Sequence, residues 1–178
     1  DPVDHPKNVV VVGSGPAGLY TAYVASKKGH QVKVIEAQEK LGGQFRIAAL
    51  PPAKSLLANP LRFWIQEGKK QGVEYMTNTT ATKELIADLH PDAVVLATGA
   101  KQSKPPIEGI DGEHVFMAKD VIEGKVRGGH NVLIVGGGLV GLECADFLRE
   151  RAGRHSTIID QIPTINYGVL GVGTHLKA

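Results

Sequence analysis

VVVVGSGPAG at residues 9–18 and VLIVGGGLVG at residues 132–141 are the two stretches of sequence that decide the fold. Each is a run of four apolar residues that leads into the pattern G-x-G-x-x-G. An acidic residue closes the next apolar run in both cases, Glu36 after the first stretch and Asp160 after the second. A glycine turn between a strand and a helix, with an acid about 20 residues later, is the fingerprint of a βαβ unit that binds a dinucleotide. The chain therefore predicts an α/β fold of two tandem Rossmann-like units.

The three glycines of each loop have different predicted roles. The first lets the chain turn tightly off the strand, the second leaves room for a pyrophosphate beside the backbone, and the third lets the helix pack closely on the strand. In this order they are Gly13, Gly15 and Gly18 in the first loop, and Gly136, Gly138 and Gly141 in the second. The phosphates would lie at a helix N-terminus, where unpaired N–H groups and the helix dipole favour anions. Either loop alone could be a simple strand-to-helix connection, but two loops with matched acids argue against that alternative.

Composition and charge narrow the class of protein. The 178 residues suffice for one good core or two small ones. The net charge of +2 comes with no cluster of lysine and arginine, which argues against nucleic acid as a partner. The apolar runs are far shorter than the roughly 20 residues that cross a bilayer, and the polar start of the chain does not read as a signal peptide. A single cysteine excludes an intrachain disulfide and fits a reducing compartment. We therefore expect a cytoplasmic protein without a membrane partner.

The apolar pattern along the chain predicts alternating strands and helices. Strands are expected over residues 8–12, 31–36, 73–82, 92–97, 131–135 and 156–160, and helices over 15–28, 60–71, 84–89, 118–123 and 138–151. Residues 39–55 contain two glycine or proline pairs and are expected to be rich in loops. The continuous apolar run of residues 92–97 is typical of a strand buried on both faces. A proline- and glycine-containing connection after it predicts two domains, residues 1–103 and 104–178.

The second domain is short for its predicted fold. A complete dinucleotide-binding unit needs more strands than follow residue 131. We therefore expect a truncated second unit, and a chain that is a fragment of a longer protein. Such a unit would expose a sheet edge and an apolar helix face, which favours marginal stability and self-association.

Several features, in this order, resemble one group of flavoproteins. They are the loop of residues 13–18, Glu36, the segment Leu41–Phe45 with Lys54 in the following loop, the strand end Ala97–Gly99, and the loop of residues 136–141. Together they resemble the C-terminal FAD/NAD(P)-binding module of the 2,4-dienoyl-CoA reductase and trimethylamine dehydrogenase family, within the pyridine nucleotide-disulfide oxidoreductase-like superfamily. The resemblance implies a glutathione-reductase-like fold. It also implies a flavin barrel and an iron–sulfur cluster in the missing remainder of the parent enzyme.

The resemblance also implies cofactors and the residues that hold them. Residues 1–103 would bind FAD, or ADP in its place, and residues 104–178 would be the first part of a domain that binds NADH or NADPH. The implied cofactor-binding residues are Gly13, Gly15, Pro16, Ala17, Gly18, Glu36, Ala37, Gly43, Gln44, Thr98, Gly99, Gly136, Gly138, Gly141, Glu143 and Asp160. The sequence departs from the family pattern in one respect. The family closes its FAD domain with a later segment that contains a Gly-Asp pair, and this sequence has no such segment.

Other chemistry is not indicated by the sequence. Cys144 has no partner for a redox disulfide, so we interpret it as packing material inside a helix. The seven histidines are scattered without the spacing of metal ligands. The sequence also contains no recognisable pattern of a nucleophilic triad. Trp64 is expected to be a core anchor. We therefore predict no catalytic side chain and no metal, because the cofactors would supply the chemistry.

Two hypotheses of function follow. The first is the FAD- and NAD(P)H-binding portion of a flavin-dependent oxidoreductase that passes hydride from nicotinamide to flavin, with electrons leaving for an acceptor outside this chain. The second is a structural module that holds ADP or FAD without turnover. In the first case Asp160 favours NADH over NADPH, because its carboxylate would repel a 2′-phosphate. Arg154 in the preceding turn could offset that repulsion.

Overall fold

The structure is a computed structural model that describes residues 2–162. The described chain divides into two compact units. The first consists of the residues up to Ala49 together with Leu56–Gln102, and the second of Leu50–Ser55 together with the described residues from Ser103 onward. The short segment Leu50–Ser55 therefore belongs with the second glycine loop although it lies within the first half of the sequence.

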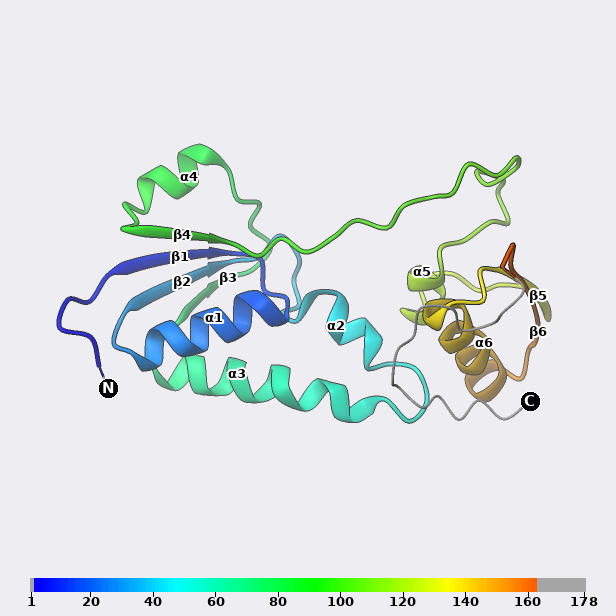
Figure 1. The fold of residues 1–178 in the computed structure, drawn as a ribbon, viewed down its shortest axis with the longest axis horizontal. Helices are drawn as coiled ribbons and strands as arrows, with labels where there is room; N and C mark the ends of the chain where they lie inside the picture. Colours follow the sequence, from blue (N-terminus) through cyan, green and yellow to red (C-terminus); the bar gives the residue numbers. More distant parts are fainter. Residues whose placement is uncertain (1, 163–178) are drawn as a thin grey trace. The chain divides into compact units, whose positions relative to one another are not determined.

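A four-stranded parallel sheet with the order β3-β2-β1-β4 forms the centre of the first unit (Figure 1). Its strands are β1 (Asn8–Val12), β2 (Gln31–Ile35), β3 (Glu74–Met76) and β4 (Ala93–Leu96), and its helices are α1 (Pro16–Lys27), α2 (Gly43–Ala48), α3 (Ala58–Lys70) and α4 (Lys83–Asp88). Helices α1 and α3 lie on one face of the sheet and α4 on the other (Figure 1). The crossovers through helices are those that parallel neighbours require.

The core of the first unit has one layer on each face of the sheet. Because side chains alternate along a strand, β1 sends Val9 and Val11 to one layer and Val10 and Val12 to the other. The first layer also contains Ala22 from α1. The second contains apolar side chains of α4, namely Leu85 and Ile86, with Leu89 just after it. Both faces of β1 are thus covered, and the chain enters the first glycine loop from the centre of the sheet.

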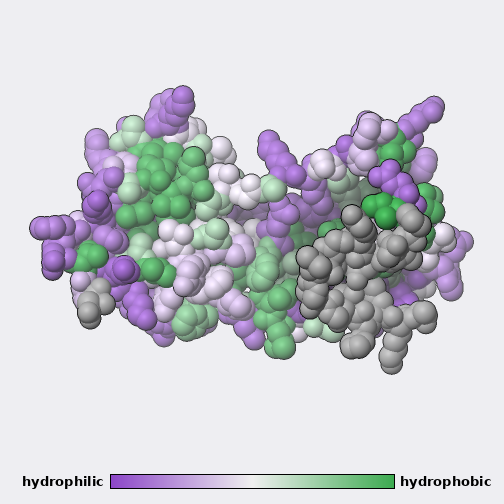
Figure 2. Space-filling view, viewed as in Figure 1, coloured by the Kyte–Doolittle hydropathy of each residue, from purple (hydrophilic) through white to green (hydrophobic). Residues whose placement is uncertain are grey.

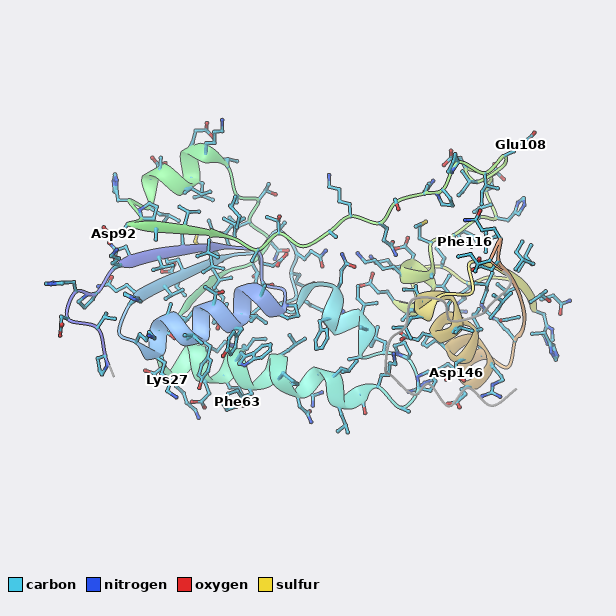
Figure 3. The ribbon with its side chains drawn as sticks, in the orientation of Figure 1. Lys27, Phe63, Asp92, Glu108, Phe116 and Asp146 are labelled. Atoms are coloured by element: carbon cyan, nitrogen blue, oxygen red, sulfur yellow. The ribbon has the colours of Figure 1, made fainter. Side chains whose placement is uncertain are left out.

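The predicted strand over residues 92–97 forms, but it is not buried on both faces. It is β4, the edge strand of the sheet, and among the described residues it pairs only with β1. Val95 packs on the core, whereas Val94 is 43% and Leu96 74% exposed. Figure 2 shows a hydrophobic area where α4 and β4 lie in Figure 1. Asp92 at the start of the strand ties the edge to β1, because its carboxylate accepts from Asn8 N–H at 2.7 Å (Figure 3).

The stretch 39–55 is rich in loops as predicted, although it also contains the short helix α2. One further prediction for the first unit is wrong in its extent. The strand predicted over residues 73–82 covers only Glu74–Met76. It ends early because Asn78 adopts a positive φ of 52° and turns the chain, and Thr79 N–H then donates to Glu36 C=O.

The aromatic side chains of α1 and α3 pack against one another at the surface. Trp64 meets Tyr20 edge-on at 5.4 Å between ring centroids, and Phe63 meets Tyr23 at 5.5 Å. Phe63 and Lys27 lie on the outer side of these helices (Figure 3). Trp64 was predicted to be a core anchor; it is half-buried, and it anchors α3 on α1.

The second unit is smaller. It contains α5 (Ala118–Ile122), β5 (Asn131–Val135), α6 (Leu139–Ala152) and β6 (His155–Ile159), and the two strands pair in parallel. The buried hydrophobic side chains come from α5, β5 and α6: Ile122, Ile134, Leu142, Cys144 and Leu148. The expected exposed apolar face is present, but it belongs mainly to the sheet: Leu133 is 60% and Val135 58% exposed. Within residues 2–162, no helix is long and apolar enough to cross a membrane.

Candidate nucleotide-binding sites

The first glycine loop has the geometry that its sequence predicts. Gly13 has a φ of +100°, and a Cβ added there would lie 2.4 Å from the carbonyl oxygen of Ala97. A Cβ on Gly18 would lie 1.9 Å from the carbonyl oxygen of Gly13, so the first turn of α1 rests directly on the loop. At Gly15, by contrast, no described atom lies within 4 Å of an added Cβ. The loop is therefore closed at its first and third glycines and open at the second.

The N-terminus of α1 borders this open space. Gly15 is the residue before the helix, Pro16 is its first residue and Ala17 follows. No described side chain caps this end with a hydrogen bond, and the first turn carries no acidic residue. The first N–H groups of a helix have no partner inside the helix, so this end can bind an anion.

Glu36 lies at the end of β2 and is tied back to the loop. Its Oε2 accepts from Ser14 N–H at 2.9 Å and from the Ser14 hydroxyl at 2.6 Å, and its Oε1 accepts from Gln38 N–H at 2.8 Å. Burial alone would raise the pKa of this carboxyl, but the hydrogen bonds from Ser14, Gln38 and Ala37 outweigh it and lower the pKa below the usual value. Glu36 is therefore a fixed, ionised acceptor.

The turn at Gly42 and Gly43 packs on the same loop. Gly42 N–H donates to the carbonyl oxygen of Ser14 at 2.9 Å and approaches its hydroxyl at 3.3 Å. Gly43 has a positive φ of 53°, and a Cβ there would lie 3.1 Å from Gly15 Cα, so glycine favours this close approach of the two backbones. The first unit thus brings the turn, the glycine loop and Glu36 together.

Three more predicted residues lie around this loop. Thr98 follows β4, and its Cα would be 3.2 Å from a Cβ on Gly13. Gly99 comes next with a φ of +73°. The side-chain amide of Gln44 donates to the carbonyl oxygen of Ala100, which ties α2 to this strand end. Ala100 and Gly42 were not among the predicted site residues, since backbone contacts of this kind leave no signal in residue type.

The second glycine loop repeats the geometry of the first. A Cβ on Gly141 would lie 1.9 Å from the carbonyl oxygen of Gly136, while no described atom lies within 4 Å of a Cβ on Gly138. No described side chain caps the N-terminus of α6 with a hydrogen bond. Asp160 accepts from Gly137 N–H at 2.6 Å and from Ile162 N–H at 2.8 Å. The hydrogen bonds from Ile162 and Gly137 hold the pKa of Asp160 below its usual value.

Glu143, one helical turn into α6, does not present a free carboxylate. It forms an ion pair with Lys54, and both side chains are largely buried. Lys54 comes from the segment Leu50–Ser55, 89 residues away in the sequence. The resemblance to the flavoprotein family drew attention to each of these two residues, but it gave no sign that they meet.

Both loops therefore fit a dinucleotide: each leaves the position beside its second glycine open, ends at an uncapped helix and holds an ionised acid. Residues 7–170 match the pyridine nucleotide-disulphide oxidoreductase family. The chain belongs to this family. Its members are oxidoreductases that bind FAD and NAD(P)H.

Individual relatives are considerably longer than this chain. It is 44% identical over 164 residues to the NADH oxidase of Thermoanaerobacter brockii, covering 89% of this chain and 25% of that protein. It is also 44% identical over 149 residues to the bilirubin reductase of Mediterraneibacter gnavus, covering 84% of this chain and 23% of that protein. A solved structure of a 2-naphthoyl-CoA reductase matches with a TM-score of 0.88 and 34% identity over 94% of this chain and 25% of that one. The chain thus spans about a quarter of the length of these proteins.

Proposed function

We propose that this chain is the FAD- and NADH-binding part of a flavin-dependent oxidoreductase of the 2,4-dienoyl-CoA reductase and trimethylamine dehydrogenase type. The observation that carries the proposal is the pair of glycine loops, each open at its second glycine and each followed by an anchored carboxylate. The long reductase relatives support the subfamily. In this proposal, the rest of the parent enzyme supplies a flavin barrel and an iron–sulfur cluster.

The residues of the first unit would hold FAD. The pyrophosphate would lie against Gly15 at the uncapped end of α1, where backbone N–H groups attract anions. Glu36 would accept hydrogen bonds from the adenosine ribose hydroxyls. Gly43 and Gln44, which border the same loop, would approach the flavin portion.

The residues of the second unit would hold the nicotinamide cofactor. Its pyrophosphate would lie against Gly138, and its adenosine ribose against Asp160. When bound, the two cofactors supply hydride transfer, and the chain contributes binding and orientation. The ion pair between Lys54 and Glu143 would keep Glu143 fixed and its charge balanced.

One binding experiment tests the first site. Gly15→Val places a side chain where the pyrophosphate would lie, and its Cβ has no described atom within 4 Å, so the fold should survive and binding of FAD and ADP should be lost. Gly129→Val is the matched control, because Gly129 is exposed and its added Cβ meets an oxygen only at 3.9 Å. Mass spectrometry of the ligand released on denaturation identifies FAD or ADP. Unchanged affinity in Gly15→Val would remove the first site from the proposal.

The cofactor preference of the second site tests Asp160. Its ionised carboxylate accepts a 2′-hydroxyl but repels a 2′-phosphate with up to two negative charges. We expect flavin reduction in the full-length parent enzyme to be faster with NADH than with NADPH, and Asp160→Ala to narrow the difference. Asp146→Ala on the same unit, a carboxylate paired with Arg149 at 3.0 Å, serves as the control. Faster reduction by NADPH in the unmutated enzyme would contradict this preference.

A further inference from the structure

Ser14 occupies the variable position between the first two glycines of the first loop. Its side chain is fully buried, with an exposed fraction of 0%. The hydroxyl donates to Glu36 Oε2 at 2.6 Å, and Gly42 N–H approaches its oxygen at 3.3 Å. Its backbone N–H donates to the same carboxylate oxygen at 2.9 Å. One small residue thus links the glycine loop, the end of β2 and the turn before α2.

The second unit shows what the loop looks like without this hydroxyl. Gly137 stands at the corresponding position. It has no side chain, so its backbone N–H is the only group of this residue that donates to Asp160. The glycine pattern is therefore geometrically complete without a serine. A hydroxyl at Ser14 is an additional element whose only described side-chain partner is the carboxylate of Glu36.

We propose that Ser14 is a positioning residue that holds Glu36 in the orientation that recognises ribose hydroxyls, and so sets the selectivity of the first site for ribonucleotides. The inference rests on the proposed function, in which Glu36 meets the adenosine ribose. A carboxylate with one oxygen held by two donors cannot rotate away from the ligand without breaking both hydrogen bonds. Loss of the hydroxyl leaves one backbone donor on each oxygen, Ser14 N–H on Oε2 and Gln38 N–H on Oε1, so the carboxylate is held less tightly in its orientation.

The test compares two ligands on the 178-residue chain by titration calorimetry. ADP carries both ribose hydroxyls, and 2′,3′-dideoxy-ADP carries neither. Ser14→Ala should bind ADP about five- to tenfold more weakly, which is less than the loss of a whole hydrogen bond to a charged group because the carboxylate keeps its backbone donors. Its affinity for dideoxy-ADP should not change. Equal losses for both ligands would show that Ser14 acts through the shape of the loop and would overturn the inference.

Two further variants separate positioning from folding. In a Glu36→Ala background, Ser14→Ala should cause no additional loss of ADP affinity, because the group that it positions is gone. Additive losses would overturn the inference. Ser26→Ala is the matched control: Ser26 is also buried, but its hydroxyl donates to Tyr23 C=O within α1, so ADP affinity should not change.

Failure of this inference can be told apart from failure of the proposed function. If Glu36→Ala weakens ADP binding and Ser14→Ala does not, the result supports the ribose contact of Glu36 and contradicts the positioning role of Ser14. If the unmutated chain binds neither nucleotide, or if Glu36→Ala leaves ADP binding intact, the result contradicts both the proposed ribose site and the role of Ser14. Ser14→Cys, nearly the same size but a weak donor, should behave as Ser14→Ala does and guards against a packing defect.

Discussion

The two glycine loops share a backbone but not an environment. In both, the N–H of the first glycine donates at 2.8 Å to the residue before the acid, Ile35 C=O in one and Ile159 C=O in the other. The first loop, however, is backed by β4, whereas no described atom lies within 4 Å of a Cβ on Gly136. Glu36 is half-buried at the end of a four-stranded sheet, whereas its counterpart Asp160 is exposed beside a two-stranded one. The geometry of the loop is therefore local, and the enclosure of its site depends on the neighbouring strand.

The largest effect should come from the third glycine of each loop, where the units agree. Gly18→Ala and Gly141→Ala each place a methyl group 1.9 Å from a backbone carbonyl oxygen. We expect each to destabilise its own unit by about 3 kcal/mol or more, at or above the upper end of the usual cost of overpacking, because backbone atoms cannot move aside as a side chain can. Denaturant unfolding followed by the fluorescence of Trp64, the single tryptophan, reports the first unit. Hydrogen exchange of β5 and β6 reports the second. Gly15→Ala and Gly138→Ala, which meet no described atom, are the matched controls.

Substitution of the first glycine of each loop should destabilise the two units to different extents. Both Gly13 and Gly136 have positive φ, which costs an alanine about 1–2 kcal/mol. Only Gly13→Ala also drives a methyl group to 2.4 Å from the carbonyl oxygen of Ala97. Gly13→Ala should therefore destabilise the first unit by about 2 kcal/mol more than Gly136→Ala destabilises the second. The same two probes measure this difference, and equal losses would mean that β4 does not back the first loop in solution.

These units also show which parts of the structure the sequence could predict. Strands β1, β5 and the helices after their loops were predicted within one residue at each end, because apolar runs and glycine turns are local signals. The exposure of β4 was not predicted, because an apolar run has the same sequence pattern whether or not a further strand lies beside it.

The candidate sites show the same limit. Glu36 and Asp160 were located by their spacing after the loops. The contacts of Ser14 with Glu36, and of Lys54 with Glu143, join residues 22 and 89 positions apart. Spacing identifies the strand end at which a residue lies, but the direction of its side chain depends on packing that no short motif encodes. These contacts could therefore be found only in the structure.

A smaller effect is expected from the ion pair of the second unit. Lys54→Met leaves the largely buried Glu143 carboxylate without its partner, which should destabilise the second unit by about 1–3 kcal/mol. Lys33→Met is the control, because the pair of Lys33 with Glu74 is exposed on both sides and should contribute at most about 1 kcal/mol. Hydrogen exchange of α6 and β6 checks the first variant, and Trp64 fluorescence the second. Losses of the same size would mean that the Lys54 pair is no better shielded than a surface pair.

The smallest effect should come from giving the second loop the serine of the first. A Cβ on Gly137 would lie 3.4 Å from Asp160 Oδ2 and 3.6 Å from its Cβ, which is ordinary van der Waals contact. The hydroxyl of Gly137→Ser could therefore reach Asp160, as that of Ser14 reaches Glu36. Because Asp160 is exposed, water competes for its oxygens, and we expect NADH to bind less than about fivefold more tightly. Gly137→Ala adds the carbon without the hydroxyl, so it should leave NADH affinity unchanged. Titration of the parent enzyme with NADH compares the two variants. If both bind NADH equally, a hydroxyl at this position helps an acid only where strand packing has already removed it from water, which would trace the difference between the loops to β4.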